Sequence, residues 1–194
     1  MRILSGLYKG RILLSPPESA TTRPITGLAK KSLFDTLGPY LVEATLADLY
    51  CGTGTMGIEA LSRGASHCYF ADMDRLVLER LKENLETLGA ADRSTVWAGD
   101  IHARLAGWLE PLRAPIDIAF VDPPYEQARR WAWDEVAASI FHPLAAHMVD
   151  GGVMVLRVPA DVQAPPRVGP FSSFRSKCYG EMTILLMRAQ EKDH

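Results

Sequence analysis

The 194-residue sequence is poor in the residues that build disulfide frameworks and metal sites. Its three cysteines, Cys51, Cys68 and Cys178, are odd in number and form no C-x-x-C pair, and its five histidines are scattered. We therefore expect no disulfide framework, no metal site and a reducing cytoplasm as the compartment.

Long hydrophobic runs are also missing from the chain. No stretch of eighteen apolar residues occurs, which is about the length a membrane-spanning helix needs, and residues 1–5 do not begin a secretory signal. We therefore expect neither a membrane span nor export. With 47% hydrophobic residues, the composition fits one globular domain, to which we assign residues 25–194 after a small appendage at residues 1–24.

Positive charge is concentrated at the start of the sequence. The first 32 residues hold six basic side chains and one acidic, a net charge of +5, whereas the remaining 162 hold 15 basic and 22 acidic, a net charge of −7. A basic arm on an acidic body is typical of binding to nucleic-acid phosphates, although a solvated hairpin would show the same charges. The expected RNA contacts are Lys9, Arg11, Arg23, Lys30 and Lys31.

The order of the expected elements is that of a Rossmann-like α/β fold. A loose alternation with Gly6 and Gly10 over residues 2–15 predicts a short N-terminal β-hairpin. Strands are expected at 46–50, 68–71, 95–98, 116–121 and 153–158, helices at 26–41, 56–62, 76–88 and 101–109, and a helical region at roughly 128–148. A closing hairpin is expected over 174–187. We therefore predict a mostly parallel seven-stranded sheet with a C-terminal antiparallel hairpin and with ligands at the carboxyl ends of the strands.

A glycine-rich turn follows the first of these strands. Gly52, Gly54 and Gly57 satisfy the dinucleotide fingerprint, and Asp72 lies twenty residues after the first of them, so an NAD-dependent oxidoreductase is one interpretation. Asp48, however, places a carboxylate where a cofactor's ammonium group would meet it, and a pyrophosphate would gain nothing from that charge. S-adenosylmethionine has an ammonium group, a ribose diol and no phosphate, and it suits this turn better.

The tetrapeptide Asp122-Pro123-Pro124-Tyr125 follows another apolar strand. Because proline has no amide N–H, this backbone offers only carbonyl acceptors beside a carboxylate and an aromatic ring. Such a pocket suits a planar group with an NH2, such as the exocyclic amine of a nucleobase. The four residues are therefore predicted to be catalytic, with the Asp122 carboxylate and the Pro123 carbonyl accepting the two N–H groups while a methyl group is transferred.

Together these motifs resemble the RsmD-type 16S rRNA (guanine-N2)-methyltransferases. The resemblance is carried by residues 2–11, 48–65, 72–75 and 122–125, and it extends over nearly the whole chain. It implies a class I S-adenosylmethionine-dependent methyltransferase fold and methylation of a guanine N2 in the 16S rRNA of the small ribosomal subunit. It also implies that Asp72 holds the ribose hydroxyls and that Asp100 and Ile101 flank the adenine. The expected cofactor-binding residues are Asp48, Tyr50, Gly52, Thr53, Gly54, Gly57, Asp72, Met73, Asp100 and Ile101.

One stretch departs from the family pattern. After Arg23-Pro24 the family carries an Asp-Arg pair and then Arg-Glu before Leu-Phe, whereas residues 25–34 here read ITGLAKKSLF. Another RNA guanine or the N6 of a DNA adenine is therefore an alternative target. The Asp-Pro-Pro-aromatic motif also serves enzymes that methylate protein glutamine.

Overall fold

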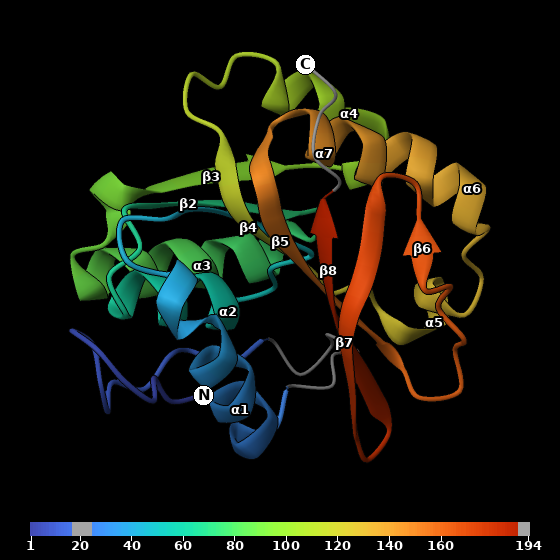
Figure 1. Cartoon of the computed structure of the whole chain (residues 1–194). Coiled ribbons are helices and arrows are strands. Elements are labelled where there is room, and N and C mark those ends of the chain that lie inside the picture. Colours follow the sequence, from blue (N-terminus) through green and yellow to red (C-terminus); the bar gives the residue numbers. More distant parts are fainter. Residues whose placement is uncertain (17–24, 190–194) are drawn as a thin grey trace. The chain divides into compact units, whose positions relative to one another are not determined.

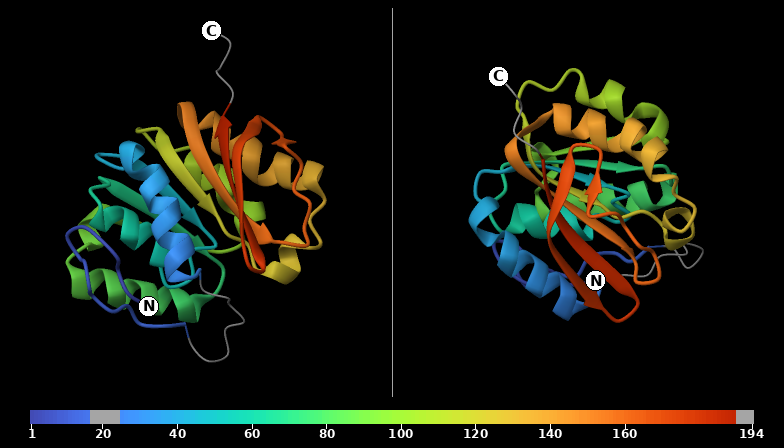
Figure 2. Two further views of the ribbon diagram at one scale, coloured as in Figure 1. Left: turned by 60° about the horizontal axis from the view of Figure 1, so that its bottom comes forward. Right: turned by 45° about the vertical axis from the view of Figure 1, so that its right-hand side comes forward.

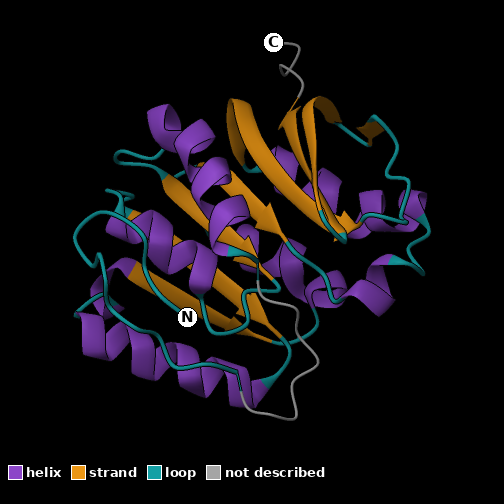
Figure 3. Ribbon diagram, turned by 90° about the horizontal axis from the view of Figure 1, so that it is seen from below, coloured by secondary structure: helices purple, strands orange, loops and turns teal. Residues whose placement is uncertain are grey.

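The computed structural model describes residues 1–16 and 25–189, which belong to two compact units, Met1–Gly99 and Asp100–His194. Each unit combines strands with helices, as Figure 1 shows along the chain and Figure 3 shows by type of element. Among the described residues, no helix is both long enough and apolar enough to cross a membrane.

The first unit is built on three parallel strands in the order β3-β2-β1. Its elements are α1 (Gly27–Leu37), η1 (Gly38–Tyr40), β1 (Thr45–Leu49), α2 (Thr55–Ser62), β2 (His67–Asp72), α3 (Arg75–Leu88), η2 (Ala91–Arg93) and β3 (Ser94–Ala98). Helices α2 and α3 pack against these strands and lie below them in the view of Figure 1. Parallel strands with crossover helices bring the carboxyl ends of β1 and β2 to one edge of the sheet.

The second unit has five strands in the order β4-β5-β8-β7-β6. Its elements are α4 (Ile101–Leu109), β4 (Ile116–Val121), α5 (Tyr125–Ala128), α6 (Trp133–Val136), a π-helical turn η3 (Ala137–Phe141), α7 (His142–Ala146), β5 (Met148–Pro159), β6 (Arg167–Val168), β7 (Phe171–Tyr179) and β8 (Met182–Ala189). Strands β4 and β5 are parallel, and the pairs β5–β8, β8–β7 and β7–β6 are antiparallel. The hairpin of β7 and β8 is the reddest part of the chain in Figure 2.

Most of the sequence-based elements are confirmed. Thr26 caps α1, because its Oγ1 accepts the Ala29 amide at 3.3 Å, and Gly89 ends α3 in the left-handed conformation at φ +65°. The described residues contain eight strands rather than the seven predicted, because β6 adds a two-residue strand. The helical region predicted over 128–148 is confirmed, but it is divided into shorter helices, since Ala132 has an extended backbone and η3 and Pro143 interrupt the regular helical ladder.

The N-terminal segment forms the predicted hairpin in a minimal form. It has one antiparallel bridge, Arg2–Ile12, with backbone hydrogen bonds between residues 1–3 and 10–13, and it buries Ile3, Tyr8 and Leu13 against the first unit. The expected boundary at residue 24 and the expected RNA contact Arg23 lie outside the described residues. Burial of three large side chains makes residues 1–16 part of the packing of this unit.

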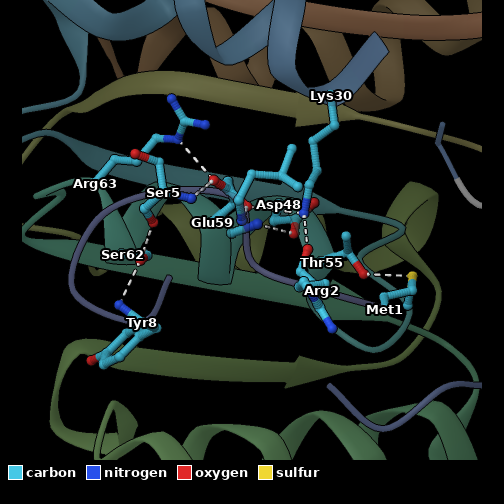
Figure 4. A network of polar contacts seen from close by, with 12 residues as sticks. Met1, Arg2, Ser5, Tyr8, Lys30, Asp48, Thr55, Glu59, Ser62 and Arg63 are labelled. Carbon is cyan, nitrogen blue, oxygen red and sulfur yellow. Dashed lines mark hydrogen bonds and ion pairs between the residues drawn. The ribbon is translucent and has the colours of Figure 1, made fainter. Parts of the chain in front are cut away.

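A buried carboxylate on α2 fastens this segment to α1 and α2 (Figure 4). Glu59 is fully buried, and its two oxygens accept four donors. These donors are the Leu4 amide at 2.8 Å, the Ser5 amide at 3.1 Å, Arg63 Nε at 2.8 Å and Lys30 Nζ at 2.9 Å. A buried charge is tolerated only when it is paired and hydrogen-bonded, and here two amides and two cations meet that need.

The location of Lys30 corrects the predicted RNA interface. Its side chain is 4% exposed, and its ammonium group donates to the Arg2 carbonyl at 2.9 Å as well as to Glu59. A cation fixed in the interior cannot reach a phosphate. Lys30 is therefore a structural residue, because its positive charge neutralises the buried Glu59 carboxylate.

Adjacent lysines allow this assignment to be tested. Lys31 pairs with Asp35, but both side chains are more than half exposed. We expect Lys30→Met to lower the free energy of unfolding by about 3 kcal/mol, because it leaves a buried charge short of a partner. Lys31→Met should change it by less than about 1 kcal/mol. Urea unfolding of both variants measures the difference, and equal losses would contradict the buried pair.

Candidate functional site

The three glycines of the turn after β1 serve three different purposes. Gly52 has φ +54°, and an added Cβ would meet nothing within 4 Å, so this position is open. Gly54 has φ +84°, and a Cβ there would lie 2.4 Å from Leu81 Cδ1. At Gly57 a Cβ would lie 2.3 Å from the Phe70 ring, so this glycine allows α2 to pack closely on β2. Of the three, Gly52 is the glycine at which a ligand has room to approach.

The amide groups of these glycines are all engaged within the first unit. The Gly52 amide donates to Asp72 Oδ2 at 2.9 Å, and the Gly54 amide donates to the Cys51 carbonyl at 2.9 Å. The Gly57 amide donates to Asp48 Oδ2 at 2.8 Å. The turn is therefore shaped by its own carboxylates, and it keeps these donors from an incoming phosphate.

Asp48 is 1% exposed and lies at the N-terminus of α2. Its negative charge thus occupies the place where a helix dipole favours an anion. A direct contact with a cofactor's ammonium group, predicted from the sequence, stays a prediction. The structure shows this carboxylate hydrogen-bonded to the helix through the Gly57 amide.

Asp72 ends β2 and is less deeply buried than Asp48. Its Oδ1 accepts the Asp74 amide at 3.0 Å, so both of its oxygens accept hydrogen bonds from the backbone. Burial raises the pKa of Asp72 above its usual range, although these hydrogen bonds oppose the shift. Each carboxylate oxygen has a second lone pair, which leaves Asp72 able to accept the hydroxyls of a ribose.

Other expected cofactor residues border this turn. The Thr53 hydroxyl is buried and has no hydrogen-bond partner among the described residues, which is unusual for a buried polar group. Tyr50 adopts φ +62°, a rare conformation for a residue other than glycine, and Met73 is 70% exposed. A strained backbone, an orphaned hydroxyl and the open Gly52 at one strand end fit a ligand such as a nucleoside.

Asp100 and Ile101 belong to the second unit, where they begin α4. Asp100 caps the helix, because its Oδ1 accepts the His102 amide at 2.9 Å. The Ile101 side chain is 2% exposed and packs in the core of that unit. Their predicted placement beside an adenine stays a prediction.

The predicted catalytic tetrapeptide follows β4 directly. The Pro124 carbonyl accepts the amides of Gln127 and Ala128, both at 2.9 Å, and so starts α5. This carbonyl is therefore occupied by the helix, whereas Pro123 is buried one residue earlier. Because the Pro124 carbonyl is engaged in this way, the Asp122 carboxylate and the Pro123 carbonyl are the acceptors of this motif that we consider for an amine.

Sequence reasoning missed Arg157, which pairs with Asp122. Its Nε donates to Asp122 Oδ1 at 2.5 Å, and the two side chains are 13% and 21% exposed, respectively. Burial raises the pKa of Asp122, and the charge and hydrogen bond of Arg157 oppose the rise. The signal was present in the sequence, since Arg157 is the one charged residue in the apolar run 153–158 and a charge in a buried strand needs a partner.

Two guanidinium groups lie near the ring of Tyr125. The Cζ atoms of Arg157 and Arg129 are each 6.0 Å from the ring centroid. Arg129 is held by Asp161, with Nε to Oδ2 at 3.0 Å, and by Glu126, with Nη1 to Oε1 at 2.7 Å. Cation–π contacts with these two groups therefore orient the Tyr125 ring, and one of the two, the Arg157 guanidinium, also binds the Asp122 carboxylate.

The expected RNA contacts do not share one environment. Lys9, Arg11 and Lys31 are exposed, and Arg11 Nη2 donates to the Thr87 carbonyl at 3.2 Å. Lys30 is buried, as described above. A role of the exposed three in binding RNA stays a prediction.

Comparisons with known proteins agree with these motifs. The family model "Conserved hypothetical protein 95" matches residues 1–188. A Bacillus subtilis protein, YlbH, named as a candidate rRNA methyltransferase, is 33% identical over 93% of this chain and 94% of its own. The Escherichia coli ribosomal RNA small subunit methyltransferase D is 36% identical, over 66% of this chain and 61% of its own. The solved structure of yhhF, a candidate methyltransferase from E. coli, covers 99% of both chains at 29% identity with a TM-score of 0.79.

The pairing of Asp122 with Arg157 predicts how this carboxylate titrates. The pKa of Asp122 should lie above its usual range, and Arg157→Gln should raise it further because the opposing charge is lost. Arg129→Gln serves as the control, since Arg129 reaches Tyr125 at the same distance but binds Asp161. Carboxyl-carbon NMR titration measures the three values.

The sign of the linked stability effect follows from this raised pKa. The folded protein holds the Asp122 proton to a higher pH than the unfolded chain, so stability falls as pH rises from the ordinary pKa through the raised one. An unchanged Asp122 pKa in Arg157→Gln would show that the ion pair does not set the charge of Asp122.

Proposed function

Because the chain belongs to the conserved hypothetical protein 95 family, as the match over residues 1–188 shows, we propose that it is a methyltransferase that uses S-adenosylmethionine to modify small-subunit rRNA. The names of its relatives support the reaction and the RNA, and the resemblance of its motifs to RsmD-type enzymes supports guanine N2 as the target. Ribosomal RNA as substrate would place the enzyme in the cytoplasm.

The observation that carries the proposal is the occupied N-terminus of α2. A dinucleotide-binding turn presents free amides and a positive helix end to a pyrophosphate. Here the Asp48 carboxylate already accepts the Gly57 amide, and the amides of Gly52 and Gly54 have acceptors of their own. The turn therefore repels phosphate and suits a nucleoside that carries a cation, which argues against the oxidoreductase alternative.

In this proposal the first unit holds the adenosyl group. Asp72 accepts the two ribose hydroxyls, Gly52 gives the ligand room, and Thr53 supplies the hydroxyl that lacks a partner. S-adenosylmethionine supplies an electrophilic methyl group on a sulfonium.

The second unit would hold the target amine. The N2 lone pair of guanine is delocalised into the ring, so the nitrogen is a weak nucleophile. Asp122 Oδ2 and the Pro123 carbonyl would accept its two N–H groups and favour positive charge on the nitrogen. Arg157 fixes the other oxygen of Asp122, which orients the carboxylate, and Tyr125 stacks on an extruded base. The proton leaves after transfer, because the alkylated amine is acidic.

Cofactor identity can be tested by calorimetry. Wild-type protein should bind S-adenosylmethionine and its demethylated product, but not NAD. Asp72→Ala should weaken binding by about 1.5–3 kcal/mol for each hydrogen bond lost to the ribose, since these bonds are charge-assisted. Asp74→Ala is the matched control, because Asp74 caps the neighbouring α3 through the Leu76 amide. Tight NAD binding without a response to S-adenosylmethionine would overturn the proposal.

Methyl transfer can be tested with tritiated S-adenosylmethionine, in-vitro transcribed 16S rRNA and purified small subunits. Asp122→Ala should leave cofactor affinity nearly unchanged and cut the rate by about 10²–10³-fold, because a preorganised acceptor is lost. Tyr125→Ala should weaken base capture by about 1–3 kcal/mol, whereas Tyr125→Phe should be nearly silent, because the ring provides the stacking. Full activity of Asp122→Ala would refute the mechanism.

Nucleoside mass spectrometry of the product identifies the base. N2-methylguanine is the expected product, and the departure at residues 25–34 makes another guanine or the N6 of adenine the rival targets. An adenine product would keep the roles of Asp122 and Tyr125 but change the assigned substrate.

A further inference from the structure

Strand β7 presents a basic and aromatic surface that the reaction described above does not use. Residues 174–178 are exposed without interruption, and β6 pairs with β7 only near its start, at Phe171 and Ser172. With the half-buried Tyr179 included, residues 174–179 read FRSKCY, in which aromatic and basic side chains are interleaved. Such interleaving is the composition of surfaces that stack bases and bind phosphates.

The register of the sheet relates this strand to the predicted catalytic motif. Val121 pairs with Leu156 in the parallel β4–β5 ladder, so the residues that follow them, Asp122 and Arg157, occupy the same register position. Arg157 pairs with Ile184 of β8, which in turn pairs with Lys177 of β7. Paired residues project to the same face of a sheet, so Lys177 lies on the face that carries Arg157.

The neighbouring residues of β7 extend this face. Arg175 and Tyr179 lie two positions to either side of Lys177 and therefore project with it. Two strand spacings, roughly 10 Å, separate the backbone of β7 from that of β5. At a rise of about 3.4 Å per nucleotide in a helical strand, this corresponds to about three nucleotides. The surface is thus close enough to Arg157 to contact nucleotides that flank a base bound at Asp122.

Cations and rings are also paired on the hairpin. Lys177 Nζ lies 4.9 Å from the Tyr179 ring centroid, and Arg188 Cζ lies 4.9 Å from that of Phe174, which is 48% exposed. The hairpin over residues 171–189 carries three basic side chains and one acidic one, whereas residues 33–194 as a whole carry a net charge of −7. Positive charge is therefore concentrated here within an acidic part of the chain.

We propose that this β7 surface, formed by Phe174, Arg175, Lys177, Tyr179 and Arg188, binds the single-stranded rRNA that flanks the target base. The inference rests on the proposed function and names a part of its substrate interface. Arg175 and Lys177 contact phosphates, and the aromatic rings stack on unpaired bases.

Charge on β7 also has a purely structural explanation. Basic side chains on an exposed edge strand prevent pairing with other chains, which protects against aggregation. That role depends on charge of either sign, whereas phosphate binding requires positive charge. Substitution by glutamate therefore separates the two explanations.

The experiment compares Arg175→Gln/Lys177→Gln with a control that removes the same two residue types from an exposed helix, Arg80→Gln/Lys82→Gln on α3. The probe is small-subunit rRNA transcribed in vitro. The β7 variant should bind more weakly, and the slope of log affinity against log salt should fall by about 1.4, or about 0.7 for each phosphate contact on a single strand. KM for the RNA should rise while affinity for S-adenosylmethionine and the melting temperature stay unchanged.

A glutamate variant, Arg175→Glu/Lys177→Glu, should keep the oligomeric state of the wild-type protein and bind RNA still more weakly. RNA affinity and salt slope equal to those of the control would overturn the inference while leaving the methyltransferase activity in place. A defect seen on assembled small subunits but not on naked rRNA would also overturn it, in favour of a contact with a ribosomal protein. Absence of methyl transfer by the wild-type protein to any nucleic acid would instead refute the proposed function.

Discussion

The first unit depends on one buried carboxylate whose two oxygens accept four donors. Glu59 sits at the centre of α2 without exposure to water, and it is stable there because two amides and two cations donate to it. Three of these bonds, from the Leu4 and Ser5 amides and from Lys30, attach the N-terminal segment and α1 to the helix that follows the glycine turn. The orientation of α2, and with it the shape of the turn, therefore depends on groups distant in sequence.

Local signals were enough to predict most elements and the positions of the two motifs. The caps at Thr26 and Gly89 and the apolar run of β4 can each be recognised from a few consecutive residues. The helical region at 128–148 was predicted as well, but its break at Ala132 was not, because the apolar content of the sequence continues through that break. The short N-terminal hairpin was predicted from its alternation and glycines, whereas the burial of Ile3 and Leu13 in the core of the first unit was not.

Pairings between distant residues could not be predicted from composition. Lys30 and Lys31 look equivalent in the sequence, yet one neutralises Glu59 in the interior and the other is exposed. Charge counting predicted nucleic-acid contacts in the first 32 residues and did not register the basic side chains of β7, because the net charge of the remaining chain is negative. For Arg157, the sequence does indicate that a partner is needed, because a charged residue lies inside an apolar strand. It does not indicate that this partner is Asp122.

The engaged amides of the glycine turn have a consequence for how a ligand is taken up. Because Gly52, Gly54 and Gly57 already have acceptors within the first unit, the turn needs no ligand to hold its conformation. It is preorganised, so association would not have to order the loop, and the associated loss of conformational entropy would be small. A product could then leave and a new ligand could bind without any refolding of the glycine turn between turnovers.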